Sequence, residues 1–259
     1  MSTMALPESL DRPTADERGV GGRRRPDVAA YHATGAAAFA LVAVLLRGWA
    51  WCLLWPAVSS TLVAMAYAKD WPCVFGKRRG VLPAWSPILF GPHLVGLRVA
   101  WWVQSHGRTP CAELLPGLWI GRRPGQDDCE ELLRRGVRST LDLSAELPER
   151  PALRGAGYHN VPILDLTLPD VATLDRAVRV IAHAMPRGAV YVHCALGYGR
   201  TAVIAAAYLL ASGHAATVDA AVARVCGCRP GCAFPPRVRR LLETFRAACN
   251  DAATVPRQV

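Results

Sequence analysis

The order of apolar and polar residues divides the chain into three parts. Residues 1–30 are polar and contain several Pro, Gly and Arg residues, which predicts a disordered tail. Residues 31–109 are mostly apolar. From residue 110 onward, short apolar runs alternate with stretches of helical periodicity, which is typical of an α/β layer fold. The pattern therefore predicts a tail, an apolar helical segment and an α/β domain of residues 110–259.

The apolar segment is long enough to cross a membrane. Residues 34–68 are apolar except for Arg47–Gly48, Pro56 and a pair of serines. A spanning helix needs about 20 residues, so this run exceeds one upright helix and is barely enough for two. We expect a hairpin of two short helices that turns near Arg47–Gly48. A single span over residues 49–68 is the second layout, and a buried helical pair of a soluble domain is the third.

Charged and aromatic residues around this segment indicate a bilayer as a partner. All eight tryptophans lie between Trp49 and Trp119, and tryptophan favours the membrane interface. Residues 81–103 are apolar but interrupted by prolines, which predicts an amphipathic segment lying on the membrane. In a hairpin the basic residues fall on one side, as the positive-inside rule prefers. We therefore expect the inner (cytoplasmic) membrane, with the α/β domain facing the cytosol. The basic residues are Arg23, Arg24, Arg25, Lys69, Lys77, Arg78 and Arg79.

The α/β domain is predicted from its periodicity and its glycine breaks. The expected strands are residues 118–121, 138–143, 159–163 and 189–193. The expected helices are residues 127–135, 172–185, 200–212, 217–226 and 237–248.

Overall composition narrows the class of protein further. The chain is 52% hydrophobic, 19% charged and 7% aromatic, which excludes an intrinsically disordered protein, and its formal charge is +10. Its basic stretches flank the apolar segment and lack interleaved aromatics in a soluble domain, so no nucleic-acid partner is expected. The nine cysteines are odd in number and scattered, which favours free thiols in a reducing compartment. Cys226, Cys228 and Cys232 lack the usual spacing of zinc ligands, so structural thiols are expected and zinc is the alternative.

The candidate chemistry is concentrated in residues 190–201, Val-Tyr-Val-His-Cys-Ala-Leu-Gly-Tyr-Gly-Arg-Thr. An apolar strand presents His193 and Cys194, and a loop with two glycines leads into a helix that starts at Arg200. The backbone N–H groups of such a loop form an anion cradle at the helix N-terminus. A cysteine at its base is expected to be a thiolate at neutral pH, and the arginine can hold two phosphate oxygens. Thr201 is placed to donate to the sulfur. The expected phosphate-binding residues are Ala195, Leu196, Gly197, Tyr198, Gly199 and Arg200.

The stretch HCALGYGRT resembles the HC-x5-R-[ST] signature of the cysteine-dependent protein tyrosine phosphatase superfamily. Residues 113–249 are similar to its dual-specificity branch, here in a bacterial, membrane-anchored form. The resemblance implies a central mixed sheet flanked by helices and a two-step reaction through a phosphocysteine, with no metal or other cofactor. It assigns Cys194 as the nucleophile, Arg200 and the 195–199 backbone as phosphate binders, and Thr201 as an aid to departure of the sulfur. His193 would tune the thiol.

The resemblance also requires an aspartic acid that protonates the leaving oxygen. Asp165 lies 29 residues before Cys194, directly after a predicted strand, and Asp170 lies 24 residues before it. We expect Asp165 to be the acid. Asp170 is the alternative, although it precedes a helix and can serve as its N-cap.

The sequence specifies the substrate less closely than it specifies the type of reaction. Ala195, Leu196 and Tyr198 are uncharged, which weakens an assignment to highly phosphorylated inositol lipids. A membrane-localised phosphoprotein is the first expectation, and a phospholipid monoester such as phosphatidylglycerophosphate is the second. A silent phosphate-binding adaptor is the third, although an intact Cys194 argues against it. Rhodanese-like sulfur transfer fits the Arg-Thr pair less well. Nothing in the pattern indicates an oligomeric state.

Overall fold

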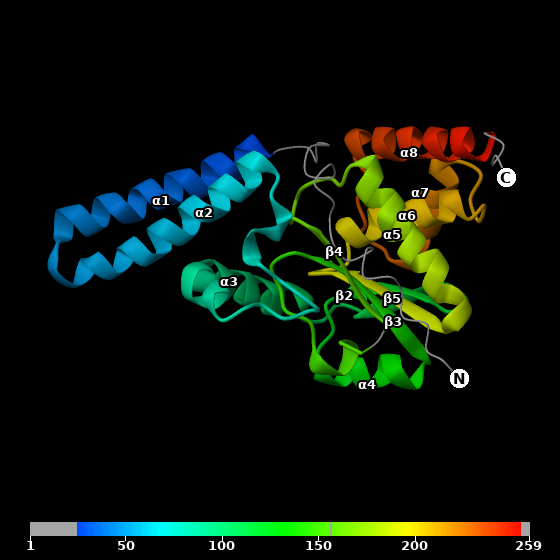
Figure 1. Ribbon diagram of the computed structural model, residues 1–259, viewed down its shortest axis with the longest axis horizontal. Helices are drawn as coiled ribbons and strands as arrows, with labels where there is room; N and C mark the ends of the chain where they lie inside the picture. Colours follow the sequence, from blue (N-terminus) through cyan, green and yellow to red (C-terminus); the bar gives the residue numbers. More distant parts are fainter. Residues whose placement is uncertain (1–24, 156, 255–259) are drawn as a thin grey trace.

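Two long helices project from an α/β domain in the computed structural model, which describes residues 25–155 and 157–254 (Figure 1). Helix α1 (Pro26–Leu46) and helix α2 (Leu54–Lys69) form an antiparallel hairpin joined by the 3₁₀ helix η2 (Gly48–Leu53). The turn falls at Arg47–Gly48, where both residues have positive φ. Of the layouts expected from the sequence, the structure therefore has the hairpin.

Helix α1 begins earlier than the sequence pattern predicted. It starts at Pro26, so the expectation of a tail over residues 1–30 was wrong for residues 26–30. Proline at the first helical position has a φ angle that suits the helix, and the negative Asp27 carboxylate stabilises the positive N-terminal end of the helix dipole. Residues 1–24 of the expected tail lie outside the described residues.

The hairpin exposes most of its apolar surface. Its helical segments, Pro26–Leu46 and Gly48–Lys69, are long and apolar enough to cross a membrane, with mean hydropathies of 1.8 and 1.4. Only 17% and 33% of the most apolar 18 residues of these two segments are buried, which does not fit the buried helical pair of a soluble domain. Exposed tryptophans lie at the tip, at Trp49 and Trp51, and near the base, at Trp71.

A connector and a third helix join the hairpin to the domain. The 3₁₀ helix η3 (Pro72–Phe75) leads through residues 76–84 to α3 (Trp85–Ser105), which contains residues 85–103 of the segment 81–103 that the sequence predicted to lie on the membrane. The indole N–H of Trp55 in α2 donates to the Ile88 carbonyl of α3 at 2.6 Å. Buried residues of α2, η3 and α3 form one cluster with two residues of the α/β domain, so the two parts share a core. Its members are Val63, Ala66, Tyr67, Val74, Phe75, Phe90, Leu94, Ala145 and Leu164.

The α/β domain contains the predicted strands and one more. The strands are β1 (Cys111–Leu115), β2 (Leu118–Arg122), β3 (Val137–Ser144), β4 (Tyr158–Ile163) and β5 (Ala189–Cys194). They form a sheet in the order β1-β2-β5-β3-β4. β1 pairs with β2 antiparallel, and the remaining neighbours are parallel. The sheet is therefore mixed, as the resemblance implied.

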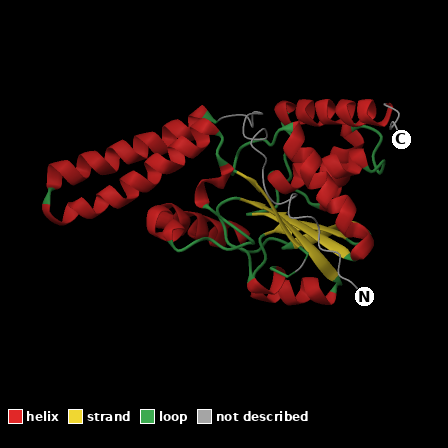
Figure 2. Cartoon of the chain, viewed as in Figure 1, coloured by secondary structure: helices red, strands yellow, loops and turns green. Residues whose placement is uncertain are grey.

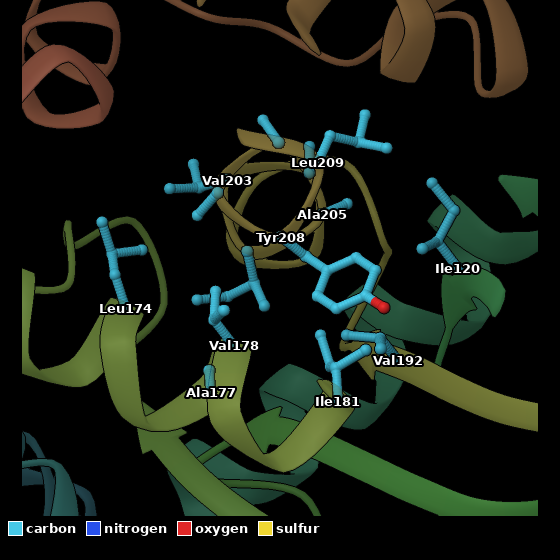
Figure 3. Packing of buried hydrophobic residues seen from close by; sticks show 14 of the residues in the cluster. Ile120, Leu174, Ala177, Val178, Ile181, Val192, Val203, Ala205, Tyr208 and Leu209 are labelled. Carbon is cyan, nitrogen blue, oxygen red and sulfur yellow. The ribbon is translucent and has the colours of Figure 1, made fainter. Parts of the chain in front are cut away.

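Helices cover both faces of this sheet (Figures 1 and 2). One face carries α4 (Gln126–Arg134), and the other carries α5 (Val171–Ala184), α6 (Arg200–Ala211), α7 (Val218–Cys228) and α8 (Pro236–Thr254). Short 3₁₀ helices η4 (Pro151–Leu153) and η5 (Met185–Arg187) lie in the connections. Figure 3 shows α6 surrounded by apolar side chains of the sheet and α5. Its alanine-rich sequence permits this close packing on all sides, which fixes the N-terminus of α6 against the end of β5.

Candidate active site

Three parallel strands end at the same edge of the sheet, and the predicted site residues lie there. Cys194 ends β5, Asp165 follows β4, and residues 145–149 follow β3. Ligand sites of parallel α/β sheets lie beyond the carboxyl ends of the strands. The order β5-β3-β4 thus brings together segments that are far apart in the sequence.

The loop after Cys194 curls back over its sulfur. The backbone N–H of Gly197 donates to the Cys194 Sγ at 3.2 Å. Gly197 has a φ of 78°, and a Cβ at this position would lie 2.3 Å from the Gly121 carbonyl oxygen. Both the left-handed backbone and the close approach to β2 therefore require glycine. Gly199 caps the start of α6, and the Ala195 carbonyl accepts from the Arg123 N–H at 3.0 Å.

A buried arginine that the sequence analysis did not identify braces this loop from outside. Arg229, directly after α7, donates from Nε to the Gly197 carbonyl and from Nη2 to the Leu196 carbonyl, each at 3.1 Å. Its guanidinium also stacks on the Tyr198 ring at 4.5 Å. Because Arg229 holds the Gly197 carbonyl on one side, the Gly197 N–H is left to donate to the Cys194 sulfur. Arg229 stands in a cysteine-rich stretch with no pattern that signals this role.

Arg200 lies buried at the start of α6, where the motif predicted it. It forms a bidentate pair with Glu146, at 3.1 Å from Nη1 and 2.9 Å from Nη2, and Nη1 donates to the Ile163 carbonyl at 2.8 Å. Burial alone would lower the pKa of Arg200, but the Glu146 and Asp165 carboxylates raise it well above its usual value. Its Nε has no hydrogen-bond partner among the described residues. Glu146 was not predicted, since a carboxylate after a buried strand gives no signal of its partner.

Thr201 is fully buried beside Arg200. Its Oγ1 also has no hydrogen-bond partner in the described part of the chain. Two buried polar atoms at the start of α6, Arg200 Nε and Thr201 Oγ1, are thus unpaired within the described residues, and the Thr201 hydroxyl makes no hydrogen bond to the Cys194 sulfur there.

The two candidate acids have different surroundings. The Asp165 Oδ1 lies 3.1 Å from Arg200 Nη2, and its side chain is 43% exposed. The Asp170 carboxylate accepts from the Thr173 N–H at 2.7 Å and caps α5. The geometry therefore places Asp165 at the cradle and gives Asp170 a structural contact.

His193 lies buried below the loop and contacts a carboxylate. Its Nε2 is 2.5 Å from Glu149 Oε2, and its Nδ1 is 3.3 Å from the Cys194 carbonyl oxygen. Burial alone would lower the pKa of His193, but the Glu149 and Asp142 carboxylates outweigh it and raise the pKa. Glu149 was not predicted either.

The three cysteines at the end of α7 and just after it make separate contacts. The Cys226 thiol donates to the Cys232 carbonyl at 3.6 Å, and the Cys228 thiol donates to the Glu113 carbonyl at 3.3 Å. Burial raises the pKa of Cys232 to about 12. All nine cysteines lie in the described residues and are free thiols.

Comparisons with known proteins agree with this geometry. The family model described as "Polymorphic toxin system, DSP-PTPase phosphatase" matches residues 117–214. Human dual specificity protein phosphatase 26 is 30% identical over 126 residues, which cover 44% of this chain and 59% of that protein. Human dual specificity protein phosphatase 12 is 33% identical over 117 residues, which cover 41% of this chain and 34% of that protein. The chain thus spans 59% of the length of the first of these relatives.

Solved structures show the same architecture. PTPMT1 in complex with PI(5)P has a TM-score of 0.50 at 18% identity, covering 56% of this chain and 99% of that one. A mouse dual specificity phosphatase complexed with zinc tungstate has a TM-score of 0.50 at 22% identity, and the match covers 60% of this chain and 97% of that one. This is the dual-specificity phosphatase fold. The matches support a place in the dual-specificity branch of the protein tyrosine phosphatase superfamily, and with it a phosphatase.

Proposed function

We propose that this chain is a membrane-anchored phosphatase that hydrolyses phosphate monoesters of phosphorylated proteins through a phosphocysteine intermediate. The observation that carries the proposal is the set of unused groups around Cys194. The Arg200 Nε and the Thr201 Oγ1 are buried without partners among the described residues, and a buried polar group left unpaired is costly. A bound phosphoryl group would pair with the arginine, and the sulfur would pair with the threonine.

The first step follows from the positions of these groups. The Cys194 thiolate attacks phosphorus, and the S–P bond forms as the P–O bond of the ester breaks. Arg200 and the loop N–H groups stabilise the negative charge of the transferring phosphoryl group. Asp165 gives its proton to the leaving oxygen, so that a hydroxyl group and a phosphocysteine result.

The second step regenerates the thiolate. The Asp165 carboxylate takes a proton from water, whose oxygen attacks the phosphocysteine phosphorus. The S–P bond breaks, inorganic phosphate leaves, and Thr201 donates a hydrogen bond to the departing sulfur. Asp165 is the expected acid because it lies at Arg200, whereas Asp170 is engaged at the cap of α5.

The hairpin supplies the proposed anchor. Its segments of 21 and 22 residues are each about 30 Å long at 1.5 Å per residue, which matches the hydrocarbon core of a bilayer. Trp49 and Trp51 at the tip and Trp71 at the base would lie at the two interfaces. Lys69 and the other basic residues near the base favour a cytosolic location of the α/β domain, in the inner membrane of a bacterium.

A phospholipid monoester is the second candidate substrate, and a specific contact favours it. The base of the hairpin touches the loop that holds the expected acid, since Arg25 donates to the Leu166 carbonyl. Val63 and Tyr67 of α2 pack in one cluster with Ala145 and Leu164 at the site edge. An anchor attached this closely would keep the cradle at the level of the lipid phosphates.

Phosphate release by the full chain in detergent and in vesicles tests the proposal. The substrates are a phosphotyrosine peptide, a phosphothreonine peptide and phosphatidylglycerophosphate. Cys194→Ser is expected to abolish release, and Asp165→Asn to lower kcat by about 10²–10⁴-fold. The matched control Asp170→Ala is expected to keep kcat within a few-fold and to lower stability by about 1 kcal/mol.

Each outcome separates the candidates. Faster release from the peptides supports a protein phosphatase, and faster release from the lipid supports the second candidate. Turnover by Cys194→Ser would contradict the cysteine mechanism. A folded wild-type chain that binds vanadate but releases no phosphate from any substrate would support the adaptor instead.

A further inference from the structure

A lysine from the connector between hairpin and domain is buried against β3, the strand beside the one that ends at the candidate nucleophile. Lys77 follows η3, outside residues 113–249 where the phosphatase resemblance lies, yet its side chain is only 2% exposed. The ammonium group forms an ion pair with Asp142. It also donates to the Ser144 carbonyl at 2.9 Å and to the Ser144 Oγ at 3.3 Å.

Asp142 links this lysine to the residue next to the nucleophile. It lies on β3 directly opposite His193 of β5, which precedes Cys194. Its Oδ1 accepts from the Ser144 N–H at 2.8 Å, and its Oδ2 accepts from the Tyr158 hydroxyl at 2.9 Å. Together with the His193–Glu149 contact at 2.5 Å, these contacts form a buried series Lys77–Asp142–His193–Glu149 that reaches the residue before Cys194.

The connector holds both ends of this series. Gly80 lies three residues after Lys77, and its carbonyl accepts from the Glu149 N–H at 2.8 Å. Gly80 has a φ of 76°, and a Cβ there would lie 2.9 Å from the Glu149 Cβ. Lys77 and Gly80 therefore fix the positions of the two carboxylates that flank His193.

The charges of the series balance only when the lysine is present. Within the series itself, two carboxylates face one ammonium and one imidazole, so these four groups sum to zero charge when His193 is protonated. Burial alone would raise the pKa of Asp142, but Lys77 and His193 lower it. Without the ammonium, the series would keep an extra buried negative charge beside His193, the residue before Cys194, and that charge would oppose a thiolate.

We infer that Lys77 is a positioning residue of the phosphatase site, which balances the buried carboxylates so that Cys194 reacts as a thiolate at neutral pH. The inference rests on the proposed role of Cys194 as the nucleophile. Other groups face this region from the elements packed around it. They are Tyr158, whose hydroxyl donates to Asp142; Tyr191, stacked on His193; Arg123, near Glu149 and Asp142; Arg150, whose N–H donates to Glu149; and Arg200 and Cys232, near Cys194. None of these is changed in the test.

The test measures the reactivity of Cys194 and requires no turnover. The full chain in detergent is treated with iodoacetamide across a pH series, and mass spectrometry of the Cys194 peptide gives the alkylation rate. Lys77→Met is expected to move the midpoint of this profile upward by about one pH unit, and Asp142→Asn to move it downward. The double variant, which loses one charge of each sign, is expected to return to the wild-type midpoint.

The matched control is Lys69→Met, because Lys69 is the chain's other lysine and is exposed. It is expected to leave the midpoint unchanged. Opposite shifts in the single variants support the inference, because a merely structural role would not change sign with the charge removed. If Lys77→Met does not fold, Asp142→Asn and the double variant still decide the question.

Two results would overturn the inference. One is a set of folded variants with the wild-type midpoint, and the other is a shift of the same sign in Lys77→Met and Asp142→Asn. A shift of the expected signs in a chain without phosphatase activity would instead refute the proposed function alone.

Discussion

Gly197→Ala tests whether the loop geometry creates the phosphate cradle. The new methyl group would lie 2.3 Å from the Gly121 oxygen and 2.4 Å from its carbonyl carbon, on a backbone with a φ of 78°. Left-handed strain costs about 1–2 kcal/mol, and overpacking against backbone costs about 1–3 kcal/mol. We therefore expect a loss of about 2–5 kcal/mol in the free energy of unfolding. The loop must also move, which would displace the N–H group directed at Cys194.

The assay compares thermal unfolding and vanadate inhibition of the detergent-solubilised chain. A loss of about 2–5 kcal/mol corresponds to a Tm lowered by about 4–20 °C for a protein of this size, and vanadate inhibition should weaken at least tenfold. Gly199→Ala is the matched control in the same loop, because its added Cβ meets no atom within 4 Å. The reasoning is refuted if Gly197→Ala keeps its affinity for vanadate and its Tm lies within about 2 °C of the wild type, which is below the smallest expected fall of about 4 °C.

Three further predictions concern charged groups that the structure brings together. Arg229→Met is expected to lower the free energy of unfolding by about 2–5 kcal/mol because it leaves buried carbonyls unpaired; an unchanged Tm would contradict this. A fragment of residues 110–259 is expected to be less stable than residues 70–259 by about 3–5 kcal/mol, because it lacks the buried partner of Asp142; circular dichroism during denaturation checks this. The raised pKa of His193 stabilises the fold below the unfolded value of about 6.5, and this contribution is lost as pH rises through the folded value. Glu149→Gln is therefore expected to be more damaging at pH 6 than at pH 9, and an equal loss at both would argue against the pair.

Most of the fold could be predicted because the relevant signals are local. The helices of the α/β domain have an apolar face at helical spacing and end near glycines, and Gly136, Gly188 and Gly213 indeed have positive φ. The exception is β1, which was missed. It has only five residues, Cys-Ala-Glu-Leu-Leu, with an exposed Glu113 in the middle. An edge strand of this kind depends on its partner β2 more than on its own sequence.

The site could be predicted only where its residues are contiguous. Cys194, its loop and Arg200 fall within seven residues, and their types alone indicate an anion cradle. Glu146 reaches Arg200 across 54 positions, and Lys77 reaches Asp142 across 65. Buried ion pairs of this kind have no periodicity, and a charged residue in the sequence is ordinarily read as exposed. The partners of the motif therefore required the structure.

These long-range contacts change where the functional unit begins. Sequence similarity locates the phosphatase in residues 117–214, whereas the buried cluster around Phe75 and Phe90 joins the hairpin to the site edge at Leu164. An anchor on a flexible linker would let a phosphatase domain sample orientations away from the bilayer, but a shared core removes that freedom. The cradle thus has a fixed position relative to the hairpin. If the hairpin spans a bilayer, Cys194 is held at a fixed distance from the membrane surface, which favours phosphate groups presented there, whichever class of molecule carries them.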